Sequence, residues 1–218
     1  MHYVISDIHN DNQRFCEILK MINFSKDDHL FILGDIFDRS DYSPNPVDLY
    51  FNILSLESRC TVLKGNHDSW LASYIFQYYA MPEWKRRKTA PYPYNTFRII
   101  TRRLTEVDIQ NLANEINGWK LQLSVEVDKQ KYLLAHAMTS RPEEEKESQY
   151  YLMGHDMNKE YRKDAIDNYI SICGHRPIGG NCIWKNDKQN LYMIDCGCGF
   201  ENGRLGCLCL ETKEEFYV

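Results

Sequence analysis

The stretch Tyr3-Val4-Ile5-Ser6-Asp7-Ile8-His9-Asn10 sets the pattern on which the rest of the chain is built. Its first three residues are an apolar run typical of a buried strand, and polar residues follow at once. Asp7 and His9 stand two residues apart just beyond this strand, so both side chains can turn toward one point. Carboxylate oxygen and imidazole nitrogen at one point suit a divalent metal ion. The pair alone is weak evidence, because such pairs also occur in ordinary polar loops.

The same order of apolar strand and polar loop returns twice in the N-terminal third. Residues 30–33 are followed by Gly34-Asp35-Ile36-Phe37-Asp38-Arg39, and residues 60–63 lead into Gly65-Asn66-His67-Asp68. Amphipathic helical spacing follows the three loops, at residues 15–22, 47–54 and 69–79. Strands that alternate with helices favour a largely parallel sheet with helices on its faces. In such sheets the loops at the carboxyl ends share one edge, so the three polar loops are expected to converge.

The composition predicts a soluble globular protein of one domain. The 218 residues are 43% hydrophobic and 26% charged, and the formal net charge is −5. This charge argues against stable binding of nucleic acid, and no apolar run approaches the roughly 20 residues that cross a bilayer. Because the first strand begins almost at Met1 without a secretory leader, we expect a cytoplasmic protein with reduced cysteines and no membrane partner.

Residues 81–120 interrupt the alternation of strand and helix. Their first part, 81–103, contains three prolines that disfavour regular structure, and seven Lys or Arg against a single Glu. Thr105 then predicts the capped start of a helix that ends near Gly118. We therefore expect a single domain over residues 1–218 with a cap-like insertion at about 81–120.

Strands and helices alternate again in the C-terminal half. Strands are predicted at residues 121–127, 132–135, 170–173, 182–184, 191–194, 205–210 and 215–218. A helix is predicted at about 159–169, and the acidic stretch 140–150 is predicted to be a solvated loop. His136 and His175 each come just after one of these strands.

Four of the seven histidines stand directly behind apolar runs: His9, His67, His136 and His175. Any one of them reads most simply as a loop or core histidine. Four in this position by chance are much less expected, because acidic and amide residues accompany them in the same loops. Those companions are Asp7, Asp35, Asp38, Asn66 and Asp68.

Taken in order, these motifs resemble the calcineurin-like metallophosphoesterase superfamily. The match consists of Asp7-x-His9, Gly34-Asp35-x-x-Asp38-Arg39, Gly65-Asn66-His67-Asp68, His136 and Gly174-His175. Its order and spacing are most similar to the phosphoprotein phosphatase branch, particularly the bacterial and phage-type serine/threonine phosphatases. The resemblance spans residues 5–210 and implies an α+β fold. That fold is an αββα sandwich of two mixed β-sheets flanked by helices, which replaces the single parallel sheet suggested by the alternation alone.

The resemblance also implies two divalent metal ions and the residues that bind them. Asp7 and His9 would bind the first ion, Asp35 would bridge the two, and the second site would be completed by Asn66, His136 and His175. Two cations about 3.5–4 Å apart can share a hydroxide and clamp a phosphoryl group for in-line attack. Oxygen and imidazole ligands suit manganese, iron or zinc, and we expect manganese.

The remaining matched residues would bind and protonate the substrate. Arg39 and Asn66 would hold phosphate oxygens, since a planar guanidinium matches two of them at once. His67, oriented by Asp38, would protonate the leaving group. A second phosphate-binding Arg has no clear match, and Arg162 and Arg141 are weak candidates.

The sequence departs from the branch at four positions where glycine is usual: Ser6, Asn10, Ser40 and Met138. These changes bear on the conformational freedom of the loops more than on metal binding.

Three functions are consistent with these motifs. The first is a metal-dependent phosphatase that hydrolyses phosphomonoesters, with phosphoserine or phosphothreonine in proteins as the expected substrate. The alternative is a nucleotide phosphohydrolase, such as a dinucleoside-tetraphosphate hydrolase, for which the basic residues 85–103 could bind polyphosphate. A catalytically silent binding module is the third, and the complete set of ligands argues against it.

Two further patterns have structural interpretations. The pairs Cys196-x-Cys198 and Cys207-x-Cys209 could suggest a zinc knuckle, but alternation along a strand explains them as paired core residues. The aromatic residues of the stretch 70–84 are expected to be helix core, with base stacking as the alternative. They are Trp70, Tyr74, Phe76, Tyr78, Tyr79 and Trp84.

Overall fold

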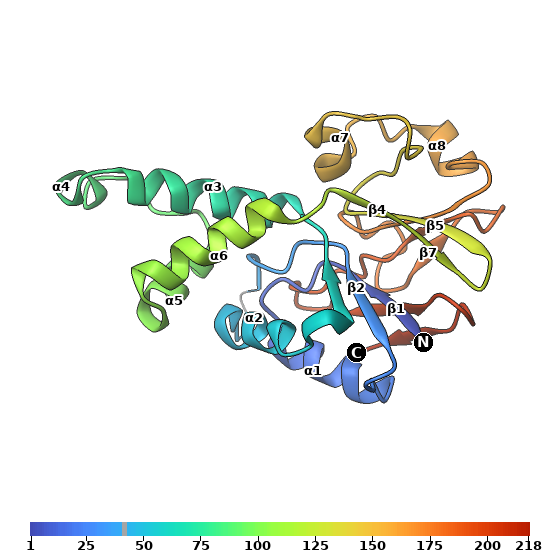
Figure 1. Ribbon diagram of the computed structural model, residues 1–218, viewed down its shortest axis with the longest axis horizontal. Coiled ribbons are helices and arrows are strands. Elements are labelled where there is room, and N and C mark those ends of the chain that lie inside the picture. The colour runs from blue at the N-terminus through green and yellow to red at the C-terminus, as the bar shows by residue number, and fades with distance from the viewer. Residues whose placement is uncertain (41–42) are drawn as a thin grey trace.

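The computed structural model describes residues 1–40 and 43–218, whose strands form two five-stranded sheets. The first sheet has the order β10-β9-β1-β2-β3 and the second β4-β5-β6-β8-β7. The sheets face each other, with α1 and α2 outside the first and α7 and α8 outside the second (Figure 1). This confirms the predicted sandwich of two mixed sheets flanked by helices.

The bounds of the strands are β1 His2–Ile5, β2 His29–Ile32, β3 Cys60–Val62, β4 Gln122–Val127, β5 Gln130–Ala135, β6 Ile170–Cys173, β7 Trp184–Lys185, β8 Leu191–Met193, β9 Gly206–Cys209 and β10 Glu215–Tyr217. Those of the helices are α1 Asn12–Met21, α2 Pro46–Leu54, α3 Asn66–Ala80, α4 Glu83–Arg86, α5 Asn95–Arg103, α6 Glu106–Gly118, α7 Ser148–Met153 and α8 Lys159–Asp164. A short 3₁₀ turn, Glu57–Arg59, precedes β3.

The expectation of one largely parallel sheet holds only for the centre of each sheet. β1, β2 and β3 are parallel to one another, as are β5, β6 and β8. β9 and β10 extend the first sheet in antiparallel fashion, and β4 pairs antiparallel with β5. The β4–β5 hairpin turns at Asp128 and Lys129, both at positive φ, which is the two-residue turn that suits antiparallel strands. Local strand patterns do not reveal this change of direction.

Three layers of core hold the sandwich together. Side chains such as Val4 and Leu134 fill the space between the sheets, while Phe15 and Ile18 of α1 pack with the outer side of the first. Tyr161 of α8 packs with Met193 of the second sheet. The strand ends are therefore fixed from both faces.

Most predicted helix boundaries agree with the structure. The Asp11 carboxylate accepts from the backbone N–H of Arg14 at 3.0 Å and caps α1, and Thr105 caps α6 through Asp108. The predicted helix at 159–169 is too long, because the backbone leaves the helical region at Ala165. The predicted loop at 140–150 is also too long, since α7 begins at Ser148.

Helices α3, α4, α5 and α6 form a helical arm that projects away from the sandwich (Figure 1). α6 packs along α3, and α5 also contacts α2. The prediction that residues 81–103 lack regular structure is wrong for α4 and α5, because Pro82 precedes α4 and the other two prolines precede α5, so neither helix is interrupted. No helix within residues 1–40 and 43–218 is both long and apolar enough to cross a bilayer.

Gly34→Ala is expected to lower the free energy of unfolding by about 3 kcal/mol. Gly34 follows β2 with φ +88°, and an added Cβ would lie 2.3 Å from the backbone nitrogen of Gly65. Urea unfolding of the metal-free protein measures the loss. Gly118→Ala is the matched control, since nothing lies within 4 Å of a Cβ there. Equal unfolding midpoints for the two variants would contradict this expectation, because they would show that the loop relaxes around the added methyl group without loss of stability.

Candidate metal centre

The polar loops converge because backbone hydrogen bonds join them at the carboxyl ends of the parallel strands. The N–H of Asp7 donates to the carbonyl of Gly34 at 3.0 Å, and that of His9 donates to the carbonyl of Asp35 at 3.0 Å. In the second sheet the N–H of Gly174 donates to the carbonyl of His136 at 2.7 Å. The predicted convergence of the strand ends is thus present.

Four candidate ligands have a left-handed backbone: φ is 55° at Asp7, 51° at His9, 52° at Asp35 and 65° at His175. A side chain in this region costs about 1–3 kcal/mol and persists only where the surroundings hold it. Asp, Asn and His enter this region more readily than most residues. Asn10, at a position where glycine was expected, has φ 64°, so an asparagine meets the same backbone requirement.

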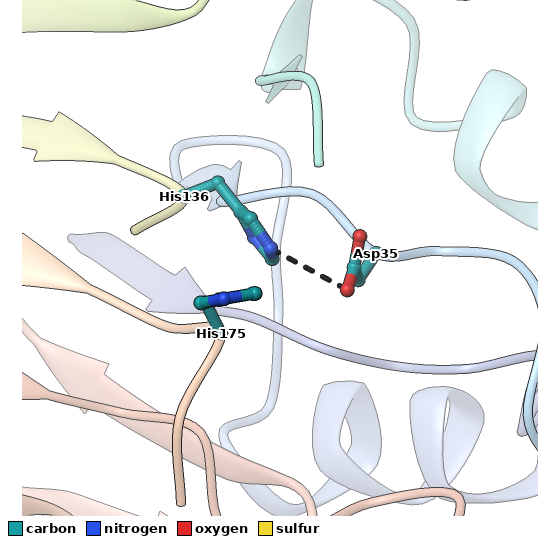
Figure 2. A group of neighbouring side chains, drawn as sticks. All are labelled: Asp35, His136 and His175. Atoms are coloured by element: carbon teal, nitrogen blue, oxygen red, sulfur yellow. Dashed lines mark ion pairs between the residues drawn. The ribbon is translucent and has the colours of Figure 1, made fainter. Parts of the chain in front are cut away.

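The side chains fall into two clusters that share one carboxylate. Asp7, His9 and Asp35 each offer a ligand atom, and these atoms lie within 4.8 Å of one another. Asp35, His136 and His175 form a second such group, in which both rings point toward the carboxylate (Figure 2). Neither cluster contains a cysteine.

Backbone carbonyls set the tautomers of two of these histidines. Nδ1 of His9 lies 3.0 Å from the carbonyl oxygen of Phe37, and Nδ1 of His136 lies 2.8 Å from that of Leu33. A carbonyl only accepts, so each Nδ1 carries a proton and each Nε2 faces Asp35. The distances from Nε2 to the Asp35 Oδ2 are 4.0 Å for His9 and 3.4 Å for His136.

Several buried polar atoms at this point lack a hydrogen-bond partner among the described residues. They are Asp7 Oδ1, His9 Nε2, Asp35 Oδ2, Asn66 Nδ2, His67 Nε2 and His175 Nδ1. A buried polar atom without a partner costs about 1–3 kcal/mol, so a cluster of them indicates a missing partner. Carboxylate oxygens and imidazole nitrogens fit manganese, iron or zinc. The residues present therefore fit a pair of divalent cations.

Asn66 joins the second cluster from the first turn of α3. This helix begins at Asn66, earlier than the predicted Ser69. The Asp68 carboxylate holds its start against the β2 loop by accepting the N–H groups of Gly65 and Asp35 at 2.9 and 2.8 Å. The Asn66 Oδ1 lies 2.9 Å from Nε2 of His136. Asn66 thereby reaches the same nitrogen that faces Asp35.

Burial and mutual charge shift the pKa values of the cluster in opposite directions. Burial raises the pKa of Asp7 to about 6 and lowers that of His9 to about 3. Burial, with the charge of His136, lowers the pKa of His175 to about 3. For His136 burial acts downward, but the Asp35 carboxylate outweighs it and raises the pKa to about 10. The same pairing holds the pKa of Asp35 low against its burial.

Metal affinity is expected to rise with pH, by about tenfold per unit between about pH 6 and pH 9. With a pKa of about 10, His136 is protonated throughout this range in the metal-free protein. A metal ligand must be neutral imidazole, so binding releases this proton and weakens as the pH falls. Calorimetric titration with Mn²⁺ in buffers of different ionisation enthalpy measures the release. Affinity and heat that do not depend on pH or buffer would contradict this exchange.

A buried histidine–carboxylate pair lies beside the clusters. Nδ1 of His67 is 3.2 Å from Oδ2 of Asp38, and both side chains are buried. The ring of His67 meets that of His9 edge-on, with centroids 5.2 Å apart. Nε2 of His67 is buried and has no hydrogen-bond partner among the described residues.

The structure places Arg39 beside the clusters. Burial is the main cause of the low pKa values of His9 and His175, and the positive charge of Arg39 contributes to lowering both. Its guanidinium lies 5.4 Å from the ring centre of Phe200. The two weak candidates for a second phosphate-binding arginine belong to other elements: Arg162 lies in α8, and Arg141 lies in the loop before α7.

Two further residues near the clusters were assigned no role from the sequence. Arg176 follows His175 directly, and its charge also acts on the pKa of that histidine. Asp195 is buried after β8, and burial together with the charge of Asp7 raises its pKa well above the usual value. Its neighbour Gly197 donates to Oδ1 at 2.8 Å, while Oδ2 has no partner among the described residues. In the sequence, the feature that could have indicated both residues is their position shortly after a predicted strand.

A family model described as calcineurin-like phosphoesterase matches residues 3–199. The search of curated proteins found no significant match.

Similar solved structures include a candidate diadenosine tetraphosphatase, with 14% identity, a TM-score of 0.72, and coverage of 100% of this chain and 92% of that chain. A serine/threonine phosphatase from Saccharomyces cerevisiae has 12% identity and a TM-score of 0.62, with coverage of 100% and 78%. A hypothetical protein from Pyrococcus horikoshii OT3 has 14% identity and a TM-score of 0.62, with coverage of 100% and 87%. At these identities the similarity shows a common fold.

Proposed function

The chain belongs to the calcineurin-like phosphoesterase family, and from this premise we propose that it removes phosphate from serine or threonine side chains of proteins. The coarser statement, a metal-dependent phosphoric ester hydrolase, follows from the family and the two ligand clusters. The observation that carries the proposal is that Asp35 belongs to both clusters, because one shared carboxylate fixes the separation of two cations.

Each ligand has a defined part in this proposal. Asp7 and His9 would hold one cation, His136, His175 and Asn66 would hold the other, and Asp35 would contribute to both sites. When bound, two divalent cations activate a shared water and neutralise charge on the phosphoryl group. We propose Mn²⁺ at both positions, with iron or zinc as the alternatives that the same oxygen and nitrogen ligands also suit.

The remaining residues bind and protonate the substrate. The Arg39 guanidinium lies beside both clusters and donates to two phosphate oxygens, and Asn66 holds a further oxygen. Asp38 accepts from Nδ1 of His67 and keeps that ring oriented. Nε2 of His67 then gives its proton to the oxygen of the departing serine or threonine, a step worth about 10²–10⁴ in rate.

A specific observation favours nucleotide hydrolysis as a second candidate. Trp70 is 43% exposed and its ring lies 4.7 Å from that of His67. Phe200 is 51% exposed beside Arg39. Exposed aromatic faces next to a proton donor and a phosphate ligand can stack a nucleobase. The cap-like insertion at 81–120 would then add positive charge for a polyphosphate.

A substrate panel at matched Mn²⁺ tests the choice between a phosphoserine peptide and diadenosine tetraphosphate. We expect the higher kcat/KM for the peptide, and an advantage of orders of magnitude for the dinucleotide would overturn this. Trp70→Ala should lower kcat/KM for the dinucleotide alone if a base stacks there. Trp84→Ala, 67% exposed on α4, is the matched control. Failure to hydrolyse even nitrophenyl phosphate with both metals bound would favour a binding module.

A further inference from the structure

Tyr92 of the helical arm contacts the histidine–carboxylate pair directly. Tyr92 belongs to the segment that links α4 to α5; its side chain is buried, and its hydroxyl donates to Oδ2 of Asp38 at 2.5 Å. The same oxygen is the one that lies 3.2 Å from Nδ1 of His67. Oδ2 of Asp38 thus accepts hydrogen bonds both from Tyr92 of the arm and from His67.

Two neighbours of Tyr92 hold the same pair from the same side. Thr96, at the start of α5, accepts the backbone N–H of Asp38 on its hydroxyl at 3.1 Å. The ring of Tyr94 meets that of His67 edge-on at 4.9 Å between centroids. Three alternate residues of one short segment therefore touch Asp38 or His67.

We propose that Tyr92 is a positioning residue, which acts through Asp38 to hold His67 in the orientation that protonates the leaving group. This inference rests on the proposed function only in assigning proton donation to His67. It gives the helical arm a part in the reaction itself, since Tyr92 and Thr96 both belong to the stretch that leaves the sandwich.

The surroundings of Asp38 explain why a second donor matters. Its carboxylate is fully buried, and Oδ1 has no partner within residues 1–40 and 43–218. The orientation of the group therefore depends on the donors to Oδ2. Hydrogen bonds to a buried charge are the strong ones, so the hydroxyl of Tyr92 resists rotation of the carboxylate. Burial and the Asp38 charge raise the pKa of Tyr92, so its hydroxyl stays protonated and donates.

Tyr92→Phe tests the proposal because it removes one hydroxyl and keeps the ring. We expect kcat for an alkyl phosphate to fall about tenfold, as for the loss of one hydrogen bond to a charged group. Hydrolysis of nitrophenyl phosphate should change little, because nitrophenolate leaves without a proton. Tyr74→Phe is the matched control, since its hydroxyl donates to the carbonyl of Ala90 within the arm at 3.1 Å. That variant should match wild type on both substrates.

The His67→Asn background separates positioning from a general structural effect. If Tyr92 acts through His67, Tyr92→Phe causes no further loss on the alkyl phosphate in that background. An equal loss on both substrates, or a further loss in the background, would overturn the proposal. Proton NMR of the metal-free protein gives an independent readout: a downfield hydroxyl resonance should vanish in Tyr92→Phe and remain in Tyr74→Phe. Its absence from wild type would also overturn the proposal, whatever the substrate of the enzyme.

Discussion

Asp35→Asn is expected to lose at least one metal ion per chain and about 10³-fold or more in kcat. Asp35 belongs to both ligand clusters, and its Oδ2 is buried without a hydrogen-bond partner among the described residues. Asparagine keeps the shape of the side chain, but its neutral amide cannot bridge two cations. Because Asp35 belongs to both clusters, its loss weakens both sites together.

Elemental analysis of the purified variant, together with hydrolysis of nitrophenyl phosphate, measures both effects. Asp27→Asn is the matched control, because Asp27 is exposed on the loop before β2. It should keep the metal content and the rate of wild type. Two metals per chain in Asp35→Asn would show that this carboxylate does not bridge.

His67→Asn is expected to lower kcat by about 10²–10⁴ on alkyl phosphates and far less on nitrophenyl phosphate. The pair of Asp38 and His67 is buried beside the clusters, and Nε2 of the ring has no hydrogen-bond partner among the described residues. A poor leaving group needs that proton, whereas nitrophenolate does not. Metal content should stay at two ions per chain, since His67 belongs to neither cluster.

A series of substrates with leaving groups of graded pKa measures this dependence. His155→Asn serves as the control, because His155 is exposed in the loop between α7 and α8. Equal losses across the series would remove His67 from the role of acid and leave it a structural part of the site.

The convergence of the site could be predicted because it depends on strand geometry. Asp7, Asp35 and Asn66 each follow a strand of one parallel set, and parallel strands bring their carboxyl ends to one edge. His136 and His175 follow two parallel strands of the second sheet. The meeting of the two sheets was not predictable from this alternation alone, and it entered through the resemblance of the whole motif series.

Contacts between residues far apart in the sequence could not be predicted from local sequence patterns. Tyr92 bonds to Asp38 across 54 residues, and nothing in a proline-rich basic stretch points to a buried carboxylate. Arg176 and Asp195 were assigned no role for a related reason, since both act on the clusters through charges that depend on the folded arrangement. Such contacts follow from the path of the helical arm and of the loops.

Two expectations about packing were wrong for physical reasons. Trp70, Phe76 and Trp84 were expected in the helix core, but all three are exposed. The arm extends away from the sandwich, so neighbouring elements cover only part of the surface of its helices. Cys196 and Cys198 were expected on one face of a strand. They lie in different cores, since the chain turns between them at Gly197, where φ is 78°.

The most direct test of a shared two-metal site is a titration of the metal-free wild-type protein with Mn²⁺. Bound metal is measured by elemental analysis and turnover by hydrolysis of nitrophenyl phosphate on the same samples. We predict two ions per chain at saturation, with turnover that requires both. A single ion at saturation, or full turnover in the presence of a chelator, would contradict the account.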